Sequence, residues 1–489
     1  MGGCGSKTTA TAMPVVDFAS VWPEYEKKLK HEGLTDAAIA AFKSNLQTLL
    51  SGVETMISEK SITPVQPKDI ADFEQLSITP KPELLKSTVV LKLNGGLGTG
   101  MGLEKAKSLL EVNAGKTFLD LIALQVKNMR DTFTPDLAFL LMDSFSTSKD
   151  TIEFLSKYHP ELGEGKDLEF LQNKAPKVTE ADCKPVTWAK DPTMEWCPPG
   201  HGDLFPALLG SGTLDRLLGQ GKQYMFVSNS DNLGAVLDLK LLTHFADSGA
   251  PFMMEVARRT DADKKGGHLA RNAKGLLLRE SAQCPAADEK AFQDVQKHSF
   301  FNTNNLWVDL KALKAQFDKN GGCLPLPVMK NSKTVDPRDK NSTKVLQLET
   351  AMGAAISCFE GATAVLIPRD RFAPVKTTSD LLALRSDAYV LTEDKRIVLA
   401  AERNGVPPNI KLDGKYKFVD ALDAMIPYGP PSLFHCKKLT VEGEVTFESS
   451  VIVKGDVTFK GPGTVKMGTY GTENGTETVD LAGDTLEGA

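Results

Sequence analysis

Hydrophobic residues return at two different spacings along the chain. Between residues 15 and 60 they recur every three to four positions among charged residues, which is the spacing of an amphipathic helix. Four prolines between residues 64 and 82 then interrupt this pattern. We therefore expect a small helical N-terminal region that occupies residues 1–85 and ends before the first strand.

From residue 88 onward, short apolar runs alternate with segments of helical spacing. The runs that predict strands are Thr88–Leu93, Leu137–Met142, Tyr224–Ser228, Phe252–Val256, Asn304–Val308 and Ala364–Ile367. This alternation is typical of an α/β fold with a mixed, mostly parallel sheet that helices cover on both faces. Ligands of such sheets bind beyond the carboxyl ends of the strands, so the polar residues that follow each run are the candidates for chemistry.

A glycine-rich loop follows the first of these runs. Residues 93–102 read LNGGLGTGMG, and Lys105 and Lys107 come shortly after them. Glycines let the backbone approach oxygen atoms closely, and the N–H groups of such a loop can bind a polyphosphate. The sequence matches neither the G-x-G-x-x-G dinucleotide motif nor the G-K-[ST] end of a Walker loop. A flexible turn is the competing interpretation.

Two later segments carry groups suited to a nucleobase. Met142 ends the second apolar run, and Gln172 lies in the sequence FLQNK, where its amide offers both a donor and an acceptor. The loop at 198–203 reads PPGHGD, in which the prolines fix φ and the glycines permit unusual backbone angles around Gly200 and His201. Taken singly, these residues are equally consistent with a core methionine, a surface amide and a solvated histidine.

Carboxylate and amide groups follow two further runs. Asp231 comes just after residues 224–228 and is the candidate ligand for a hard cation such as Mg²⁺, which takes one or two carboxylates together with substrate phosphates and water. A helix cap or an Asx-turn is the alternative for Asp231. Asn302 and Asn304 would point the same way on an extended segment and could bind sugar hydroxyls. An asparagine-rich turn is the alternative there.

The segment at 371–382, RFAPVKTTSDLL, contains the principal candidate for catalysis. A positive charge such as that of Lys376 stabilises a transferring phosphate, because charge is redistributed over its oxygens as the bond to the leaving group breaks. Thr378 or Ser379 is expected to cap a following helix, so part of this segment is structural.

Length, hydrophobic content and net charge limit the kinds of protein that this chain can be. A chain of 489 residues is long enough for two or three domains, and its 41% hydrophobic content suffices for real cores. A formal net charge of −6 argues against a nucleic-acid-binding protein, which presents a basic face to phosphates. The expected partner is a small anion that local lysines bind.

The cysteines and the N-terminal residues indicate the cellular compartment in which the protein is expected. The seven cysteines form neither C-x-x-C pairs nor a regular framework, which indicates a reducing compartment and argues against structural zinc. No apolar run reaches the roughly 18–20 residues of a membrane helix, and there is no secretory signal. The first six residues, MGGCGS, match the pattern for myristoylation of Gly2, and Cys4 offers a palmitoylation site; a chance match is the alternative. We expect a cytoplasmic protein that is partly membrane-associated if both residues are acylated.

The C-terminal tail contains an internal repeat. Val441–Phe447 reads VEGEVTF, and twelve residues later Val453–Phe459 reads VKGDVTF. Twelve residues are two hexads, and apolar residues at alternate positions with a regularly placed glycine predict a short β-helix whose coils stack Val on Val and Phe on Phe. A β-hairpin is the alternative.

The glycine-rich loop, the PPGHGD loop and the segment around Lys376 together resemble the eukaryotic UTP–glucose-1-phosphate uridylyltransferase family, the UDP-glucose pyrophosphorylases. Related N-acetylhexosamine enzymes usually carry an arginine at the position of Gly100 or Met101, so the resemblance favours the glucose branch. It is strong from about residue 91 to 382. It implies a Rossmann-like nucleotidyltransferase domain at residues 86–400 and a left-handed β-helix at 401–489 that serves packing or self-association.

The resemblance also implies a role for each candidate residue. Lys376 and Lys107 would be catalytic, and Asp231 would bind Mg²⁺. The nucleotide would be bound by Leu93, Asn94, Gly95, Gly96, Lys107, Met142, Gln172, Gly200 and Lys376. The sugar phosphate would be bound by His201, Asn229, Gly266, Asn302 and Asn304.

The implied reaction is transfer of a uridylyl group from UTP to glucose 1-phosphate, which gives UDP-glucose and pyrophosphate reversibly. UTP would bind first, and the phosphate oxygen of the sugar would attack the α-phosphorus in line without a covalent enzyme intermediate. The alternatives are a pyrophosphorylase of broader sugar specificity and a non-catalytic nucleotide-sugar-binding scaffold. His268 stands where the family usually has a small hydroxyl residue, and we expect this departure to affect hexose selectivity.

Overall fold

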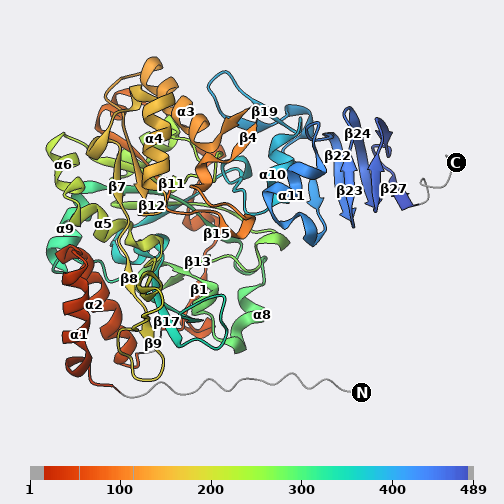
Figure 1. The fold of residues 1–489 in the computed structure, drawn as a ribbon. Coiled ribbons are helices and arrows are strands. Elements are labelled where there is room, and N and C mark those ends of the chain that lie inside the picture. The colour runs from red at the N-terminus through yellow and green to blue at the C-terminus, as the bar shows by residue number, and fades with distance from the viewer. Residues whose placement is uncertain (1–15, 54, 114, 483–489) are drawn as a thin grey trace.

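The computed structural model describes residues 16–53, 55–113 and 115–482; the predicted acylation sites Gly2 and Cys4 lie outside these ranges. A mixed sheet of eleven strands forms the centre of the molecule (Figure 1). The main path of this sheet runs in the order β2 (Ala71–Asp72), β18 (Thr363–Leu366), β12 (Phe252–Arg258), β15 (Phe300–Asp309), β11 (Tyr224–Asn229), β3 (Thr88–Leu93), β6 (Ala138–Asp143) and β7 (Glu169–Leu171).

Hydrophobic side chains on the two faces of this sheet belong to two separate cores. Val90 on β3 packs with helices α3 (Phe118–Thr132), α4 (Ser148–Tyr158) and α7 (Leu239–Ser248). Its neighbours Val89 and Leu91 pack on the other face with α5 (Leu204–Gly210), α6 (Thr213–Gly219) and α9 (Leu310–Lys319). Because side chains alternate along a strand, β3 is buried on both faces and reads as a continuous apolar run.

All six predicted strands are present, and the coarse prediction of an α/β fold with a large, mostly parallel central sheet is confirmed. Five neighbouring pairs along the main path are parallel, whereas β15 runs antiparallel to both β11 and β12. Off the main path, β13 (His268–Asn272) and β14 (Gly275–Arg279) form a hairpin, and β13 pairs with β15. The carboxyl ends of β3, β6 and β11 therefore lie at one edge of the sheet, where the glycine-rich loop begins.

The N-terminal region contains helices α1 (Phe18–His31) and α2 (Asp36–Leu50). They pack against strands β8 (Ala175–Pro176), β9 (Val178–Thr179), β10 (Trp196–Cys197), β16 (Val328–Thr334) and β17 (Lys344–Thr350) in a third core. The prediction of helix up to residue 60 is wrong, because α2 ends at Leu50 and Gly52 follows with a φ of 66°. Strand β1 (Thr63–Pro64) then pairs with β13, so this region joins the central sheet directly.

Two short helices follow the segment of Lys376. Helix α10 (Thr378–Arg385) is capped by Thr377, whose side chain accepts a hydrogen bond from the backbone of Asp380 while the Asp380 carboxylate accepts from the backbone of Thr377. The predicted caps Thr378 and Ser379 are therefore wrong by one or two residues. Helix α11 (Val419–Met425) leads into the C-terminal strands.

The C-terminal strands pair in parallel and extend away from the N-terminal helices (blue in Figure 1). They are β21 (Asn409–Lys411), β22 (Ser432–Glu442), β23 (Val445–Phe447), β24 (Val451–Lys460), β25 (Gly463–Val465), β26 (Gly468–Tyr470) and β27 (Thr476–Asp480). Val441 pairs with Phe459, and Phe447 pairs with Val465, so the pairing partners lie eighteen residues apart. Val441 therefore pairs with Phe459 and not with Val453, so the strands do not pair at the twelve-residue spacing of the repeat. The rings of Phe447 and Phe459 do contact each other as predicted, with centroids 5.4 Å apart.

Candidate active site

The glycine-rich loop leaves β3 and folds back against Lys107. The backbone N–H of Lys107 donates to the carbonyl oxygen of Gly96 at 3.0 Å. Gly98 has a φ of 72°, and a Cβ atom at this position would lie 3.2 Å from the side chain of Lys107. Because Gly98 has no side chain, the side chain of Lys107 can pass close to the backbone of the loop.

Three predicted residues meet at one point beyond the strand ends. The Nζ atoms of Lys107 and Lys376 lie 2.8 and 3.2 Å from the same oxygen, Oδ2 of Asp231. Lys107 also donates to the carbonyl oxygen of Val375, next to Lys376. The side chain of Lys107 is 14% exposed and that of Lys376 is 59% exposed, so the first lysine is fixed and the second extends into solvent.

Asp231 has the properties of a cation ligand that acts together with a substrate. Its Oδ1 atom is buried without a hydrogen-bond partner, while Oδ2 accepts from both lysines. Within the described ranges, no group of three or more His, Cys, Asp or Glu side chains could hold a metal ion. The donor set therefore fits Mg²⁺ bound by one carboxylate, phosphate oxygens and water, and does not fit a metal enclosed by protein ligands.

A glutamine amide lies between the two glycine loops. The Nε2 atom of Gln172 donates to the carbonyl oxygen of Gly200 at 3.1 Å. On its other side, a Cβ atom at Gly95 would lie 2.8 Å from Oε1 of Gln172. The hydroxyl of Ser144 donates to the carbonyl oxygen of Gly95 and fixes the loop. Three segments that are at least 28 residues apart in sequence thus form one polar surface of the kind that the edge of a base requires.

Gly200 occupies a position that only glycine can adopt. Its φ is 81° and its ψ is 170°, and a Cβ atom would lie 2.5 Å from the carbonyl oxygen and 2.9 Å from the nitrogen of Thr350. Thr350 in turn donates from its backbone to Pro199. This close approach presses the PPGHGD loop onto the end of β17 and fixes the position of Gly200 next to Gln172.

The side chains of three predicted nucleotide-binding residues point away from the site. Leu93 and Met142 are buried in the core, and Asn94 is 2% exposed. The Asn94 amide donates to Asp143 at 2.7 Å and to Thr151 at 3.0 Å, while its backbone donates to Met142. At these positions only main-chain atoms face a ligand, and the side chain of Asn94 anchors the start of the loop.

A cavity of about 780 Å³ extends from Lys376 toward the β13–β14 hairpin. Five of the predicted residues line it, namely His201, Gly266, Asn302, Asn304 and Lys376. Asn229, in contrast, is half-buried at the end of β11 and pairs in register with Leu93, outside this lining. The cavity therefore joins the predicted sugar residues to the principal candidate lysine.

The two asparagines face this cavity for a reason that the sequence did not reveal. Asn304 has a φ of 61°, and the pairing of β12 with β15 shifts between Glu255 and Val256. This bulge, and not the alternation of an extended strand, sets the direction of the side chains. The amide of Asn302 donates to Oδ1 of Asn304 at 2.7 Å, so the two side chains form one polar unit.

His201 is a neutral hydrogen-bond donor. Burial and the neighbouring charge of Lys376 lower the pKa of His201 to about 4. Its Nδ1 atom accepts a hydrogen bond from the backbone N–H of Met352 at 3.0 Å. The proton of the imidazole must therefore reside on Nε2, which can donate to an oxygen atom of a ligand without adding a charge.

The structure adds supporting residues that sequence reasoning missed. Arg371 forms a buried pair with Glu255, at 2.8 and 3.0 Å, and Trp307 donates to the same carboxylate at 2.9 Å. Glu280 lines the same cavity as the asparagines, and burial raises its pKa. Glu280 directly follows β14. Functional residues of such sheets often follow the ends of strands, so Glu280 would have been a candidate if Gly275–Arg279 had been predicted as a strand.

Comparison of the whole sequence with known proteins shows which family the chain belongs to. A family model described as UTP–glucose-1-phosphate uridylyltransferase matches residues 39–454. The chain belongs to this family. The UTP–glucose-1-phosphate uridylyltransferase of Saccharomyces cerevisiae is 40% identical over 435 residues, which are 87% of this chain and 86% of the relative. That of Solanum tuberosum is 42% identical over 392 residues, which are 79% of each chain.

Solved structures of UDP-glucose pyrophosphorylases share the fold. A mutant from Leishmania major in complex with UDP-glucose is 46% identical, has a TM-score of 0.88 and covers 94% of this chain and 99% of its own. A structure described as a UDP-glucose phosphorylase from Trypanosoma brucei is 48% identical, has a TM-score of 0.83 and covers 94% of this chain and 100% of its own. None of the helices in the described ranges has the length and apolar character needed to cross a membrane.

Proposed function

We propose that this protein transfers the uridylyl group of UTP to glucose 1-phosphate, forming UDP-glucose and pyrophosphate. The observation that carries this proposal is the meeting of Lys107, Asp231 and Lys376 where the glycine-rich loop adjoins the cavity. Two cations and one carboxylate leave net positive charge at the point where phosphates would meet. Membership of the uridylyltransferase family supports the same reaction.

The reaction forms one P–O bond and breaks another. A phosphate oxygen of glucose 1-phosphate attacks the α-phosphorus of UTP, and the bond from that phosphorus to the bridging oxygen of pyrophosphate breaks. Lys376 stabilises the negative charge on the transferring phosphate, and Lys107 holds the pyrophosphate side. Positioning and charge neutralisation supply the rate, so no covalent intermediate with the enzyme is needed.

Each end of the site has its own recognition groups. Gln172 and the backbone of Gly200 would bind the uracil edge, next to the main chain of Leu93, Gly95 and Gly96. The neutral His201 would donate to a phosphate oxygen. Asn229, Gly266, Asn302 and Asn304 would bind the hexose phosphate. Mg²⁺ would be held by Asp231 together with substrate oxygens, where it would neutralise phosphate charge.

The experiment is an assay of pyrophosphate release from UTP and Mg²⁺ with a panel of sugar 1-phosphates. Strong preference for glucose 1-phosphate, with UDP-glucose as the product, supports the proposal. Comparable rates with several sugar phosphates indicate a UDP-sugar pyrophosphorylase of broader specificity. UTP binding with no pyrophosphate release from any sugar phosphate indicates a non-catalytic nucleotide-sugar-binding scaffold.

We also propose that the chain divides into an N-terminal helical region at 1–85, a catalytic domain at 86–400 and a left-handed β-helix at 401–489. The parallel pairing of β22 with β24 at a separation of eighteen residues, or three hexads, supports a coil of three sides. Packing or self-association is its proposed role. Acylation of Gly2 and Cys4 remains a prediction, which mass spectrometry of the native protein tests.

A further inference from the structure

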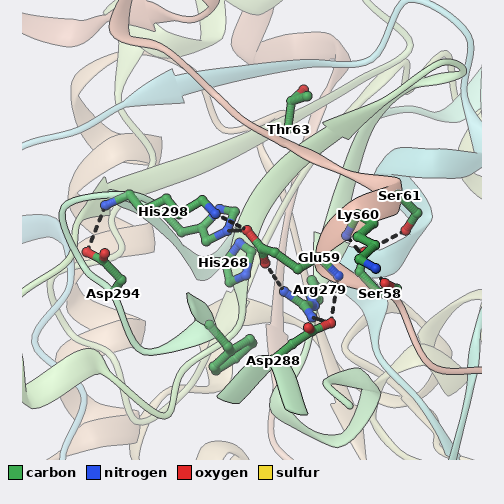
Figure 2. A network of polar contacts seen from close by, with 12 residues as sticks. Ser58, Glu59, Lys60, Ser61, Thr63, His268, Arg279, Asp288, Asp294 and His298 are labelled. Carbon is green, nitrogen blue, oxygen red and sulfur yellow. Dashed lines mark hydrogen bonds and ion pairs between the residues drawn. The ribbon is translucent and has the colours of Figure 1, made fainter. Parts of the chain in front are cut away.

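The carboxylate of Glu59, in the N-terminal region, contacts three donor side chains: those of Arg279, Lys297 and His298 (Figure 2). One oxygen of Glu59 lies 2.7 Å from Nη1 of Arg279. The other lies 2.7 Å from Nζ of Lys297 and 3.0 Å from Nε2 of His298. The backbone N–H of Glu59 donates to Asp288 at 2.7 Å, and the same Asp288 oxygen is 3.3 Å from Arg279. Glu59 is thus tied to three separate segments of the chain.

Two of the three donors to Glu59, Arg279 and His298, are deeply buried, whereas Lys297 is partly exposed. The side chains of Arg279, His268 and His298 have no or almost no exposed surface. The rings of His268 and His298 stack with centroids 3.9 Å apart, and the ring of Phe292 lies 5.0 Å from His268. Removing the carboxylate would leave the Arg279 charge with Asp288 as its remaining acidic partner inside the protein.

The segments of His268, Arg279 and His298 continue into the wall of the cavity. His268 begins β13 immediately after Gly267, and Arg279 ends β14 immediately before Glu280. His268 and Arg279 are paired across the hairpin. The backbone N–H of Asn302 donates to Gly267 at 3.2 Å. A displacement of the hairpin would therefore reach Gly267, Glu280 and Asn302 together.

His298 connects the same carboxylate to the third segment. It lies two residues before β15, the strand that carries Asn302 and Asn304. The carbonyl oxygen of His298 accepts a hydrogen bond from the side chain of Arg259, the residue after β12, and this contact holds the segment that leads into β15. The two asparagines depend on a bulge in β15, so their direction is sensitive to how the start of that strand is placed.

We propose that Glu59 is a positioning residue for the hexose-phosphate end of the site, an inference that rests on the proposed function. Glu59 does not line the cavity; it acts through Arg279, Lys297 and His298, which place the β13–β14 hairpin and the start of β15 relative to each other. Loss of this carboxylate would loosen the sugar wall and leave the glycine-rich loop unchanged.

The charge on Glu59 persists over the working range of pH. Burial alone would raise the pKa of Glu59, but hydrogen bonds from Lys297, His298 and Arg279 outweigh burial and lower the pKa to about 2. The carboxylate is therefore ionised at every pH at which the enzyme would be assayed. Its effect on sugar binding should come from position and should not titrate near neutrality.

The test compares Glu59→Ala and Glu59→Gln with the wild-type full-length protein in the pyrophosphate-release assay. We expect Glu59→Ala to raise the KM for glucose 1-phosphate at least about 5-fold while the KM for UTP changes less than about 2-fold. Glu59→Gln, which keeps an acceptor and loses the charge, should give an intermediate value. A role in stability alone would change both constants together or lower only the amount of folded protein.

Two further variants keep the test decisive. Glu195→Gln removes a carboxylate of similar exposure, 13% against 15%, that pairs with Lys28 far from the cavity, and it should change neither KM. Lys297→Met removes one donor to Glu59 at a side chain that is 43% exposed, so it should fold even if Glu59→Ala does not. We expect it to raise the KM for glucose 1-phosphate about 2- to 3-fold.

Amide hydrogen exchange provides a measurement that does not depend on activity. In Glu59→Ala, or in Lys297→Met if the former does not fold, residues 266–268 and 298–304 should exchange at least several-fold faster, and residues 93–107 should not change. Unchanged exchange and an unchanged KM for the sugar phosphate in folded variants would overturn the inference. A wild-type protein that releases no pyrophosphate with any sugar phosphate would overturn the proposed function, and exchange would still decide whether Glu59 positions these segments.

Discussion

Replacement of Lys376 by alanine should abolish most of the activity without unfolding the protein. The Nζ atom of Lys376 lies 3.2 Å from Asp231, and its side chain is 59% exposed. An ion pair this exposed contributes at most about 1 kcal/mol to stability. In contrast, a positioned donor to the charge that develops in a transition state is worth about 3–4 kcal/mol. We therefore expect kcat to fall about 10²- to 10³-fold.

The assay is initial-rate pyrophosphate release at saturating UTP, Mg²⁺ and glucose 1-phosphate, with thermal unfolding followed in parallel. Lys415→Ala is the matched control, because Lys415 is 54% exposed and its Nζ atom lies 3.0 Å from Glu444, away from the site. The control should retain wild-type kcat. Lys376→Arg, which keeps the charge, should recover part of the lost rate.

Two results would refute this reasoning. If Lys376→Ala retained kcat within about 10-fold of wild type, the transferring phosphate would not depend on this lysine. If Lys376→Ala lost kcat together with a large fall in Tm, the residue would have a structural role that its exposure does not indicate. An equal loss in Lys415→Ala would point to a general effect of removing surface charge.

Three further predictions concern other parts of the site. Gly200→Ala should lower stability by about 2–5 kcal/mol, because a Cβ atom would lie 2.5 Å from the Thr350 oxygen, and should raise the KM for UTP. Gly212→Ala, which has a similar φ of 74° but open space around it, should show only the backbone cost of about 1–2 kcal/mol in urea unfolding. Asp231→Asn should raise the Mg²⁺ concentration for half-maximal rate at least about 10-fold in a titration; an unchanged midpoint would exclude Asp231 as a ligand. Burial lowers the pKa of Lys92 to about 7 from 10.5, so between these values the unfolded chain binds more protons and stability gains with rising pH. Urea unfolding should show the advantage of wild type over Lys92→Met growing by up to about 3 kcal/mol between pH 7 and 9.5, and a constant difference would contradict the assignment.

The sheet could be predicted because its signal is local. Thr88–Leu93 forms a strand with the predicted bounds, since a run of apolar residues bounded by polar ones needs no knowledge of distant partners. The orientation of β15 could not be predicted in this way, because nothing within residues 300–309 records which strands lie on either side. The pairing of Val441 with Phe459 escaped for the same reason: the repeat of twelve residues is visible in the sequence, but the eighteen residues of a full turn depend on how the chain bends.

The site could be predicted to the level of its motifs but not of its contacts. Lys107, Asp231 and Lys376 follow recognisable segments, and the structure brings all three together. The left-handed conformation of Asn304 could not be predicted, because it depends on a bulge against another strand. Glu59 carried no signal, since a glutamate in the polar stretch SEKS just before Pro64 looks like an ordinary surface residue.

The different exposures of Lys107 and Lys376 indicate that the two lysines have different roles. Lys107 is 14% exposed and is fixed by Asp231 and by the carbonyl oxygen of Val375, so it is already positioned before a substrate binds. Lys376 is 59% exposed, and among the described residues its Nζ atom pairs with Asp231 alone, so a bound phosphate could attract it away from that carboxylate at little energetic cost. Departure of Lys376 would leave Lys107 as the remaining lysine on Oδ2 of Asp231. In a chain with a net charge of −6, this exchange would concentrate positive charge at the transferring phosphate only when substrate is present.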